Sequence, residues 1–136
     1  MPDQRHARGL IDTSVLINPP AETSLPVEAC IAAITLAELA AGVHATQDPA
    51  ERAVRQERLQ RVEATLEALP FDAASGRAYG RVFAAVLAGG RKAPGPRAFD
   101  LLIAATAAAA GIPLYTRNVD DFKGLAGVVE VVPVNN

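Results

Sequence analysis

Short apolar runs alternate along the chain with longer segments of helical pattern. The run "RGLID", residues 8–12, predicts a strand that ends in an acid, and "TSVLIN" after it predicts one or two helical turns. Residues 27–34, "VEACIAAI", are ambiguous by period, but they precede "TLAELAAG", residues 35–42, which has a helix start signal and a stopping glycine. We therefore expect a strand followed by a helix twice within the first third of the chain.

The same alternation continues in the rest of the chain. Residues 49–69 predict a charged helix about 30 Å long, in which Glu51 and Arg55 have the supportive four-residue spacing. Residues 69–72 predict a short strand or turn, and residues 73–88 predict a helix that ends at two glycines. Near the end, "IPLYTRN" predicts a strand running into a loop, and "VVEVVPV" predicts a last strand. This order favours an α/β domain with a central, mostly parallel sheet.

One predicted helix, "GPRAFDLLIAATAAAAG" at residues 95–111, is apolar almost all the way round yet carries the carboxylate of Asp100. A helix of this composition is normally buried, and a buried carboxylate is normally paired, hydrogen-bonded or bound to a metal. With Pro96 at the first helical position, Asp100 falls near the fifth, which is late for a capping role. Arg97 is the one cation within a turn of it. We therefore expect the partners of Asp100 elsewhere in the chain.

Composition narrows the class of protein. A chain of 136 residues that is 50% hydrophobic fits one domain with a substantial core. The net charge of −2 gives no overall basic signal, so nucleic-acid binding would need a local patch or a second subunit. A single cysteine, Cys30, excludes an internal disulfide, and no signal peptide or membrane-length apolar run is found. We expect one cytoplasmic domain with no membrane partner.

Several polar side chains follow the predicted strands. Asp12 ends the first strand, Glu38 comes early in the helix after the second strand, and Asp100 comes early in its own helix. The loop after the later strand adds Asn118, Asp120 and Asp121. The carboxyl ends of parallel strands share one edge of a sheet, where open α/β sheets place their ligands. Oxygen ligands of this kind suit Mg²⁺ or Mn²⁺.

Each of these residues also has a purely structural explanation. Thr35 and Glu38 have the T-x-x-E spacing of a capping box. Asp12 can cap the helix that follows it, and the acids after the later strand are common turn residues. Asp100 is the hardest to explain in this way, because its neighbours are apolar.

Three stretches and the chain length together carry a family resemblance. They are "LIDTSVLI", "ITLAELAAGV" and "FDLLIAATAAAAGIPLYTRNVDDF". The specific part is the D-x-x-I-A-A-T-A block followed by T-R-N-x-x-D-F. The chain resembles PIN domains, and in particular the ribonuclease toxins of VapBC-type toxin–antitoxin pairs, over residues 9–134. The resemblance implies a single PIN-like three-layer α/β/α domain, residues 1–136, with a five-stranded, mostly parallel sheet.

The resemblance also implies a Mg²⁺- or Mn²⁺-dependent endoribonuclease site. Its acidic motif positions correspond here to Asp12, Glu38 and Asp100, with Asp12 and Asp100 binding the ion directly and Glu38 orienting the attacking water. A fourth acid of the family corresponds to Asn118, whose amide keeps an oxygen ligand but loses a charge. Asp121, or Asp120, could restore that charge as a metal ligand. We expect one firmly held ion, with a second depending on substrate phosphate.

The expected partners follow in part from the residues and in part from the resemblance. Arg91 and Arg97 precede the Asp100 helix and Arg117 neighbours Asn118, so these arginines could bind RNA phosphates, although a solvated loop explains them as well. The resemblance implies a structured RNA such as tRNA as substrate, a cognate VapB-type antitoxin and a toxin homodimer. The alternatives are a catalytically weak or inactive PIN domain that binds protein or RNA, which Asn118 favours, and a receiver-like signalling module.

Overall fold

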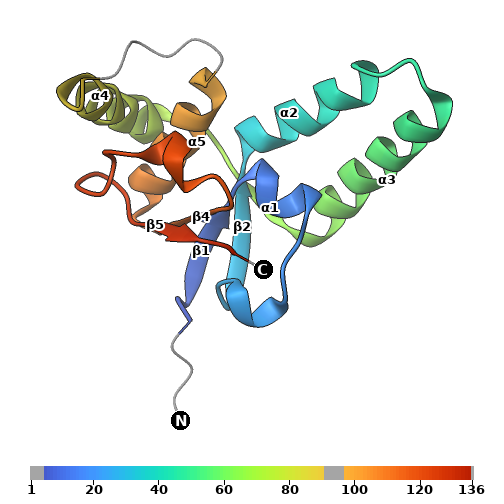
Figure 1. Ribbon diagram of the computed structural model, residues 1–136, viewed down its shortest axis with the longest axis horizontal. Helices are drawn as coiled ribbons and strands as arrows, with labels where there is room; N and C mark the ends of the chain where they lie inside the picture. The colour runs from blue at the N-terminus through green and yellow to red at the C-terminus, as the bar shows by residue number, and fades with distance from the viewer. Residues whose placement is uncertain (1–4, 91–96, 136) are drawn as a thin grey trace.

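A five-stranded sheet lies at the centre of the molecule, with helices on both of its faces (Figure 1). The computed structural model describes residues 5–90 and 97–135. All strand pairs are parallel, in the order β3–β2–β1–β4–β5. The strands are β1 (Arg8–Ile11), β2 (Glu28–Ala32), β3 (Glu67–Leu69), β4 (Leu114–Thr116) and β5 (Val131–Pro133). The expected α/β fold with a five-stranded parallel sheet is confirmed.

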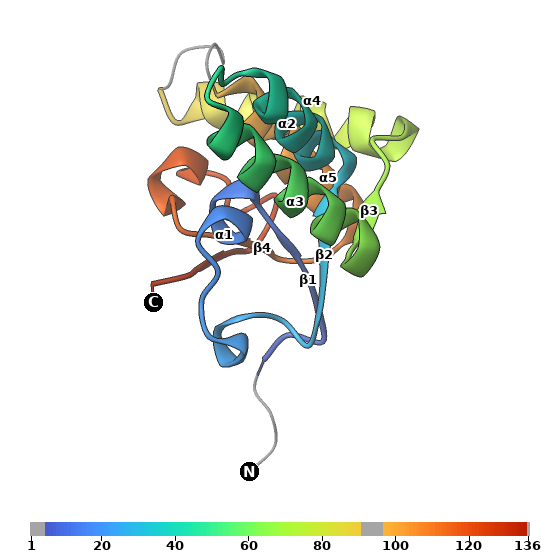
Figure 2. The same ribbon diagram turned by 90° about the vertical axis from the view of Figure 1, so that its right-hand side faces the viewer.

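The helices divide between the two faces of the sheet. On one side α4 and α5 pack against each other, and on the other side α1 lies beside a hairpin of α2 and α3 that projects from the sheet (Figures 1 and 2). The α-helices are α1 (Thr13–Ile17), α2 (Ala33–His44), α3 (Pro49–Thr65), α4 (Ala73–Ala88) and α5 (Ala98–Ala110), and the 3-10 helices are η1 (Glu22–Ser24) and η2 (Val119–Phe122). Within these described segments, no helix is both long and apolar enough to cross a membrane.

Both faces of the sheet are buried, because successive side chains of a strand point to opposite sides. Leu10 of β1 packs in the core under α4 and α5, whereas Ile11 packs with Val15 on the side of α1 and α3. Cys30 and Ile31 of β2 divide in the same way. Strands of a parallel sheet covered on both faces have nearly continuous apolar runs, which is why the period of residues 27–34 was ambiguous.

The connections bring several segments to the carboxyl ends of the strands. Leu10 of β1 pairs with both Cys30 of β2 and Leu114 of β4, so the three central strands are aligned. α1 follows β1 directly, α2 follows β2 directly, and η2 follows β4. The described part of α5 contacts both α2 and η2. Residues from four separate parts of the chain therefore lie near one edge.

Several local predictions are confirmed. α3 begins with Pro49 and is capped by Asp48, whose carboxylate accepts a hydrogen bond of 3.1 Å from the Ala50 N–H. Its i,i+4 ion pairs form, with Arg55 Nε 3.0 Å from Glu51 Oε1 and Arg61 Nη1 3.4 Å from Glu57 Oε1. α5 ends at Gly111, which adopts the left-handed conformation with φ 70° that glycine accommodates without strain.

Three predicted boundaries were wrong. α3 ends at Thr65 instead of residue 69, because Glu67–Leu69 forms β3 on the open edge of β2. This pairing is a long-range interaction that helical periodicity does not report. α2 begins at Ala33 instead of Thr35, and α5 begins at Ala98 instead of Pro96. α5 also has a solvent-exposed position that its composition did not predict, since Phe99 is 51% exposed.

Candidate active site

Asp12 lies at the end of β1 and is only 4% exposed. It is the N-cap of α1, where its Oδ1 accepts hydrogen bonds from the Val15 N–H and from the Ser14 hydroxyl. The capping explanation is therefore confirmed, but it uses a single carboxylate oxygen. Within the described chain Oδ2 makes no hydrogen bond, so it stays available to a cation.

Glu38 lies on α2, where its Oε1 accepts a hydrogen bond of 2.8 Å from the Thr13 hydroxyl. The capping-box explanation for Glu38 was wrong. The N-cap of α2 is Ala32, which makes no side-chain capping bond, and Thr35 is fully buried inside the helix. Glu38 is therefore held by α1, the helix that follows Asp12, and has no role at its own helix end.

Asp100 is the third residue of α5, in the first helical turn, because the helix begins two residues later than predicted. The pKa of Asp100 is raised from its ordinary value to about 6. Burial is the largest cause, followed by the negative charges of Asp121, Glu38 and Asp12, while Arg97 acts in the opposite direction. A carboxylate near a helix N-terminus is normally favoured, so burial and neighbouring acids outweigh that effect here. The partners of Asp100 are therefore three other carboxylates from distant parts of the chain.

The loop after β4 contributes Asp121 to this group. Asp121 lies in η2, is half-buried, and its Oδ1 is 3.4 Å from Arg97 Nη1. Asp120 is exposed, and it is absent from the carboxylates of the described chain that raise the pKa of Asp100. Of the two acids that could replace the family's fourth acid, the structure therefore brings Asp121 toward Asp100.

Asn118 lies at the start of the same loop. Its side chain is exposed, and its N–H donates to the Thr116 hydroxyl at 3.0 Å, so Thr116 has a structural role in this turn. The bond positions the backbone of Asn118 and leaves its amide group at the surface. As a metal ligand or a catalytic residue, Asn118 stays a prediction.

Ser14 is a residue of the site that the sequence reasoning missed. Its hydroxyl donates to Asp12 Oδ1 and accepts a hydrogen bond of 3.1 Å from the Arg117 N–H. One side chain therefore connects the acid after β1 to the loop after β4. The D-T-S run was the signal available in the sequence, but a serine so close to an acid is also typical of a simple helix start.

The three arginines predicted to bind RNA differ in their positions and contacts. Arg97 is the N-cap of α5 and pairs with Asp121. Arg117 Nε donates to the Asn18 carbonyl at 2.7 Å. Arg91 lies outside the described residues. Two of the arginines therefore lie beside the acids, and in both the guanidinium is held by the protein itself.

The donor set suits a hard divalent cation. Asp12, Glu38, Asp100 and Asp121 offer only carboxylate oxygens, the ligands that Mg²⁺ and Mn²⁺ prefer. Among residues 5–90 and 97–135, no three or more acidic, histidine or cysteine side chains are placed so that they could hold a metal ion together. Such an open arrangement fits Mg²⁺, which keeps several waters and is usually bound through one or two carboxylates and substrate phosphates.

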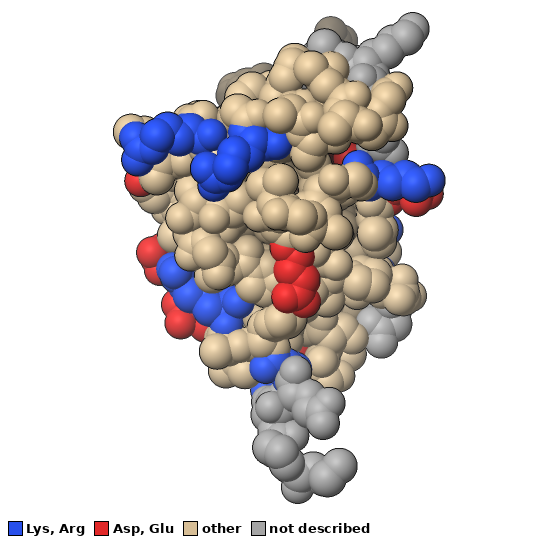
Figure 3. All heavy atoms as spheres, turned by 90° about the vertical axis from the view of Figure 1, so that its left-hand side faces the viewer, with Lys and Arg blue, Asp and Glu red and all other residues tan. Residues whose placement is uncertain are grey.

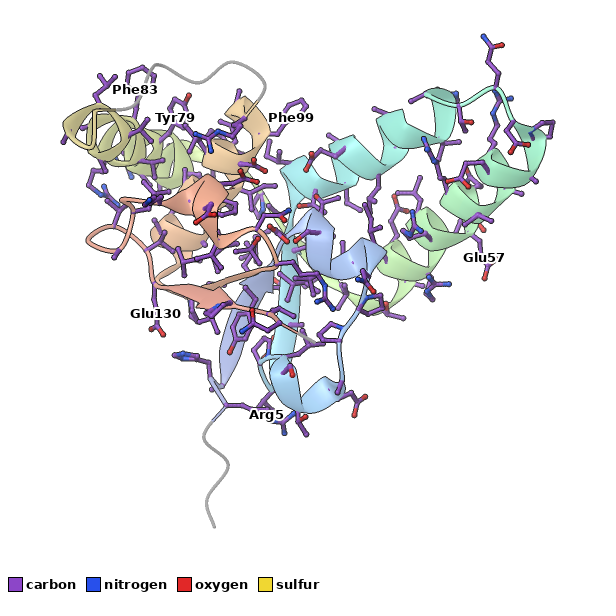
Figure 4. The ribbon with its side chains drawn as sticks, in the orientation of Figure 1. Arg5, Glu57, Tyr79, Phe83, Phe99 and Glu130 are labelled. Carbon is purple, nitrogen blue, oxygen red and sulfur yellow. The ribbon has the colours of Figure 1, made fainter. Side chains whose placement is uncertain are left out.

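Two hollows in the described surface differ in their relation to these acids. One of about 370 Å³ lies between α1, α2 and α3 and is bordered by Thr13 and Glu38. A wider one of about 600 Å³ is bordered by His6, Leu25 and Tyr115 and contains none of the four acids. Arg5 and Glu130 lie on that side of the molecule, far from Phe99 at the start of α5 (Figure 4). Of the four acids, Glu38 alone borders either of these two hollows.

Comparison with known proteins decides the family. The family model of the PIN domain matches residues 9–128. The chain belongs to the PIN-domain family. The PIN domain is 36% identical to ribonuclease VapC5 of Mycobacterium tuberculosis over 130 residues, which cover 92% of this chain and 93% of that protein. It is therefore a homologue of the VapC ribonucleases, as the sequence motifs predicted.

Solved structures agree with this assignment. The crystal structure of VapBC-5 from Mycobacterium tuberculosis, a member of the VapBC family of toxin–antitoxin systems, matches the PIN domain with a TM-score of 0.84 and 38% identity, over 94% of this chain and 99% of that chain. FitAcB from Neisseria gonorrhoeae matches with a TM-score of 0.70 and 27% identity, over 90% and 94%. VapBC2 from Rickettsia felis, solved with a promoter DNA fragment, is 21% identical and shares the fold with a TM-score of 0.72.

Proposed function

We propose that this PIN domain is a divalent-metal-dependent endoribonuclease and the toxin of a VapBC-type toxin–antitoxin pair. One observation carries the proposal: Asp12, Glu38 and Asp121, from three separate segments, lie close enough to Asp100 that their negative charges add to the effect of burial and raise the pKa of Asp100 to about 6. A fold gains no stability from uncompensated like charges at a partly buried site. Their convergence therefore points to a bound cation, and the relationship to ribonuclease VapC5 supports RNA as the substrate.

Asp12 and Asp100 are the residues that would hold Mg²⁺ or Mn²⁺, with Asp121 beside them. Asp12 is prepared for this role, because Ser14 and the Val15 N–H fix one of its oxygens and orient the other. A bound divalent cation supplies charge neutralisation at the phosphate and makes a water more acidic. Asn118, at the rim, offers an amide group for a hydrogen bond to the substrate or to a water.

Glu38 is the residue that would orient the attacking water. The Thr13 hydroxyl occupies Oε1 of Glu38, which leaves Oε2 to accept a proton from a water placed between α2 and the phosphate. Asp100 faces the same space from α5. The two acids therefore approach the phosphodiester from different helices.

Arg97 and Arg117 are the proposed contacts to RNA phosphates, and Arg91 stays a prediction outside the described residues. A guanidinium has five N–H donors and suits bidentate binding of phosphate, and the Arg97 side chain, which pairs with Asp121, is 42% exposed. Phe99, which is exposed and points from the start of α5 toward α2, offers a ring on which an unpaired base can stack (Figure 4). No described side chain in this cleft reads a base sequence, so structured RNA such as tRNA is proposed from the family alone.

A cognate VapB-type antitoxin is the proposed partner, because the VapBC-5 structure is that of a toxin–antitoxin system. A homodimer is also proposed. Most of the apolar face of α4 is core, since Ala78, Val82 and Val86 are buried. Leu87 is an exposed large apolar side chain on that helix, at 50%, and could contribute to such an interface. Cellular RNA as substrate places the proposed activity in the cytoplasm.

The charge distribution agrees with local rather than extended RNA contacts. The face that includes α4 shows small, separate groups of basic and acidic side chains on a mainly uncharged surface (Figure 3). The net charge of −2 also argues against attraction over the whole molecule. RNA affinity should therefore depend on few ion pairs and show a shallow dependence on salt concentration.

The test is cleavage of total cellular RNA by the purified protein with Mg²⁺ or Mn²⁺, with EDTA, and with the Asp100→Asn variant, reading the cut ends by sequencing. We expect metal-dependent cuts at a few sites that disappear in both controls. If folded, antitoxin-free protein cuts nothing, or Asp100→Asn cuts equally well, the alternative of a PIN domain that only binds protein or RNA takes the place of the nuclease.

A further inference from the structure

Arg97 has an unusual position for a surface arginine. It is the N-cap of α5, three residues before Asp100, and its Nη1 lies 3.4 Å from Asp121 Oδ1. The side chain is 42% exposed and that of Asp121 is 37% exposed, so the pair is partly open to solvent. The guanidinium also acts on the carboxyl of Asp100. A permanent positive charge therefore belongs to the site itself.

The number of charged side chains in the cleft limits how many divalent cations it can hold. Asp12, Glu38, Asp100 and Asp121 carry four negative charges when ionised, while Asn118, where the family commonly has an acid, carries none. Two divalent cations would neutralise four carboxylates without help. With Arg97 paired to Asp121, the remaining three acids match one divalent cation far better than two, because each further positive charge is repelled by the guanidinium.

We propose that Arg97 is a built-in counter-ion that takes the place of a second divalent cation, so that the cleft binds one Mg²⁺ or Mn²⁺ ion. This inference rests on the proposed function, since it concerns the same metal site. In two-metal sites the pair of ions stabilises the attacking and leaving oxygens of the phosphate. Arg97 would supply positive charge there instead, because its Nη1 lies 3.4 Å from Asp121 Oδ1 and a partly exposed guanidinium could also bind a phosphate oxygen.

The experiment counts Mn²⁺ ions on the purified chain, following free Mn²⁺ by electron paramagnetic resonance and heat by titration calorimetry. Arg97→Gln removes the charge and keeps a polar side chain. The matched control is Arg61→Gln, which breaks a 3.4 Å ion pair with Glu57 on α3 and changes the net charge equally. A third variant, Arg97→Lys, keeps the positive charge.

We expect one Mn²⁺ per chain for the wild type, Arg61→Gln and Arg97→Lys. Arg97→Gln should bind a second Mn²⁺, with affinity at that position raised about tenfold or more over the wild type, because a unit charge a few ångströms away no longer repels the ion. Adding Asp121→Asn to Arg97→Gln should return the count to one. Circular dichroism of each variant shows whether the fold is kept.

Three results would overturn the inference: two Mn²⁺ ions on the wild type, no Mn²⁺ on any variant, or an Arg97→Gln titration that matches Arg61→Gln. If Arg97→Gln does not fold, Arg97→Met takes its place, because it also removes the positive charge, and a single Mn²⁺ ion on that folded variant would overturn the inference. RNA cleavage is measured separately. If the ion counts are as expected but no variant cuts RNA, the nuclease proposal fails while the role of Arg97 stands.

Discussion

The helix α3 and the cleft at the carboxyl ends of the strands use the same side chains in opposite ways. On α3 glutamates and arginines alternate, and Glu51 and Glu57 each have an arginine one turn away. Among the described residues near Asp100, four carboxylates lie close to one ion-paired arginine, Arg97. The Arg61–Glu57 and Arg97–Asp121 pairs have the same 3.4 Å separation, but the first is 61% and 76% exposed and the second 42% and 37%. Surplus charge at a partly buried site, and not the ion pair itself, distinguishes the functional region.

The largest effect on RNA cleavage is expected from the loss of one acid of the cleft. Asp12→Asn keeps the helix cap, because asparagine caps as well as aspartate, but removes the charge of the carboxylate that would bind the proposed cation. We expect RNA cleavage to fall by at least about a hundredfold, since even second-layer changes at metal sites cost 10- to 100-fold. The measurement is the initial cleavage rate at saturating Mg²⁺. Equal rates for Asp12→Asn and the wild type would remove Asp12 from the metal site.

A second variant tests whether the Ser14 hydroxyl fixes the orientation of the Asp12 carboxylate. Ser14→Ala removes the hydroxyl that joins Asp12 to the loop after β4, so the carboxylate loses its fixed orientation. We expect Mn²⁺ affinity and cleavage rate to fall by about 10- to 100-fold. Thr65→Ala is the matched control, because the Thr65 hydroxyl on α3 bonds only the Arg61 carbonyl. A loss of the same size in both variants would mean that Ser14 acts through general stability.

The raised pKa of Asp100 predicts a pH-dependent effect on stability. Because the pKa of Asp100 is higher in the folded protein than in the unfolded chain, the protonated carboxyl favours the folded state at low pH. This contribution to stability is lost as the pH rises through about 6. Without metal, Asp100→Asn should therefore raise the free energy of unfolding at pH 7.5 by roughly 1 kcal/mol after allowance for solvent screening. Urea unfolding in EDTA at pH 7.5 and at pH 4 measures this.

Two further unfolding measurements test the repulsion among the four acids. The advantage of Asp100→Asn should shrink toward zero at pH 4, where both proteins are largely neutral at this position. Added Mn²⁺ should stabilise the wild type and leave the variant nearly unchanged, because ligand binding stabilises the state that binds it. A variant less stable than the wild type in EDTA at pH 7.5 would contradict the repulsion inferred among the four acids.

The smallest effect is expected on α3. Glu57→Gln removes one exposed ion pair with Arg61 and should lower the free energy of unfolding by no more than about 0.5 kcal/mol. Cleavage and Mn²⁺ binding should stay at wild-type values. A large loss of activity would show that α3 belongs to the functional surface, and the contrast between the two regions would fail.

The sequence alone determined features that depend on neighbours within a few residues. The order of strands and helices, the Asp12 cap, the Glu51–Arg55 pair and the stop at Gly111 all follow from local hydrogen bonds and periodicity. The family motifs also pointed to Asp12, Glu38 and Asp100 as acids of the candidate site. Most of the fold could therefore be predicted from short-range interactions and characteristic motifs.

How the strands, helices and acidic side chains come together depends on long-range contacts that the sequence pattern does not report. β3 forms because β2 has an open edge, and Thr35 is buried by packing instead of capping its helix. The choice of Asp121 over Asp120, and the pairing of Arg97 with Asp121, depend on where η2 lies against α5. Such contacts join residues more than twenty positions apart, and their energies depend on burial and on the sum of nearby charges. Neither quantity exists until the parallel sheet has aligned its strands.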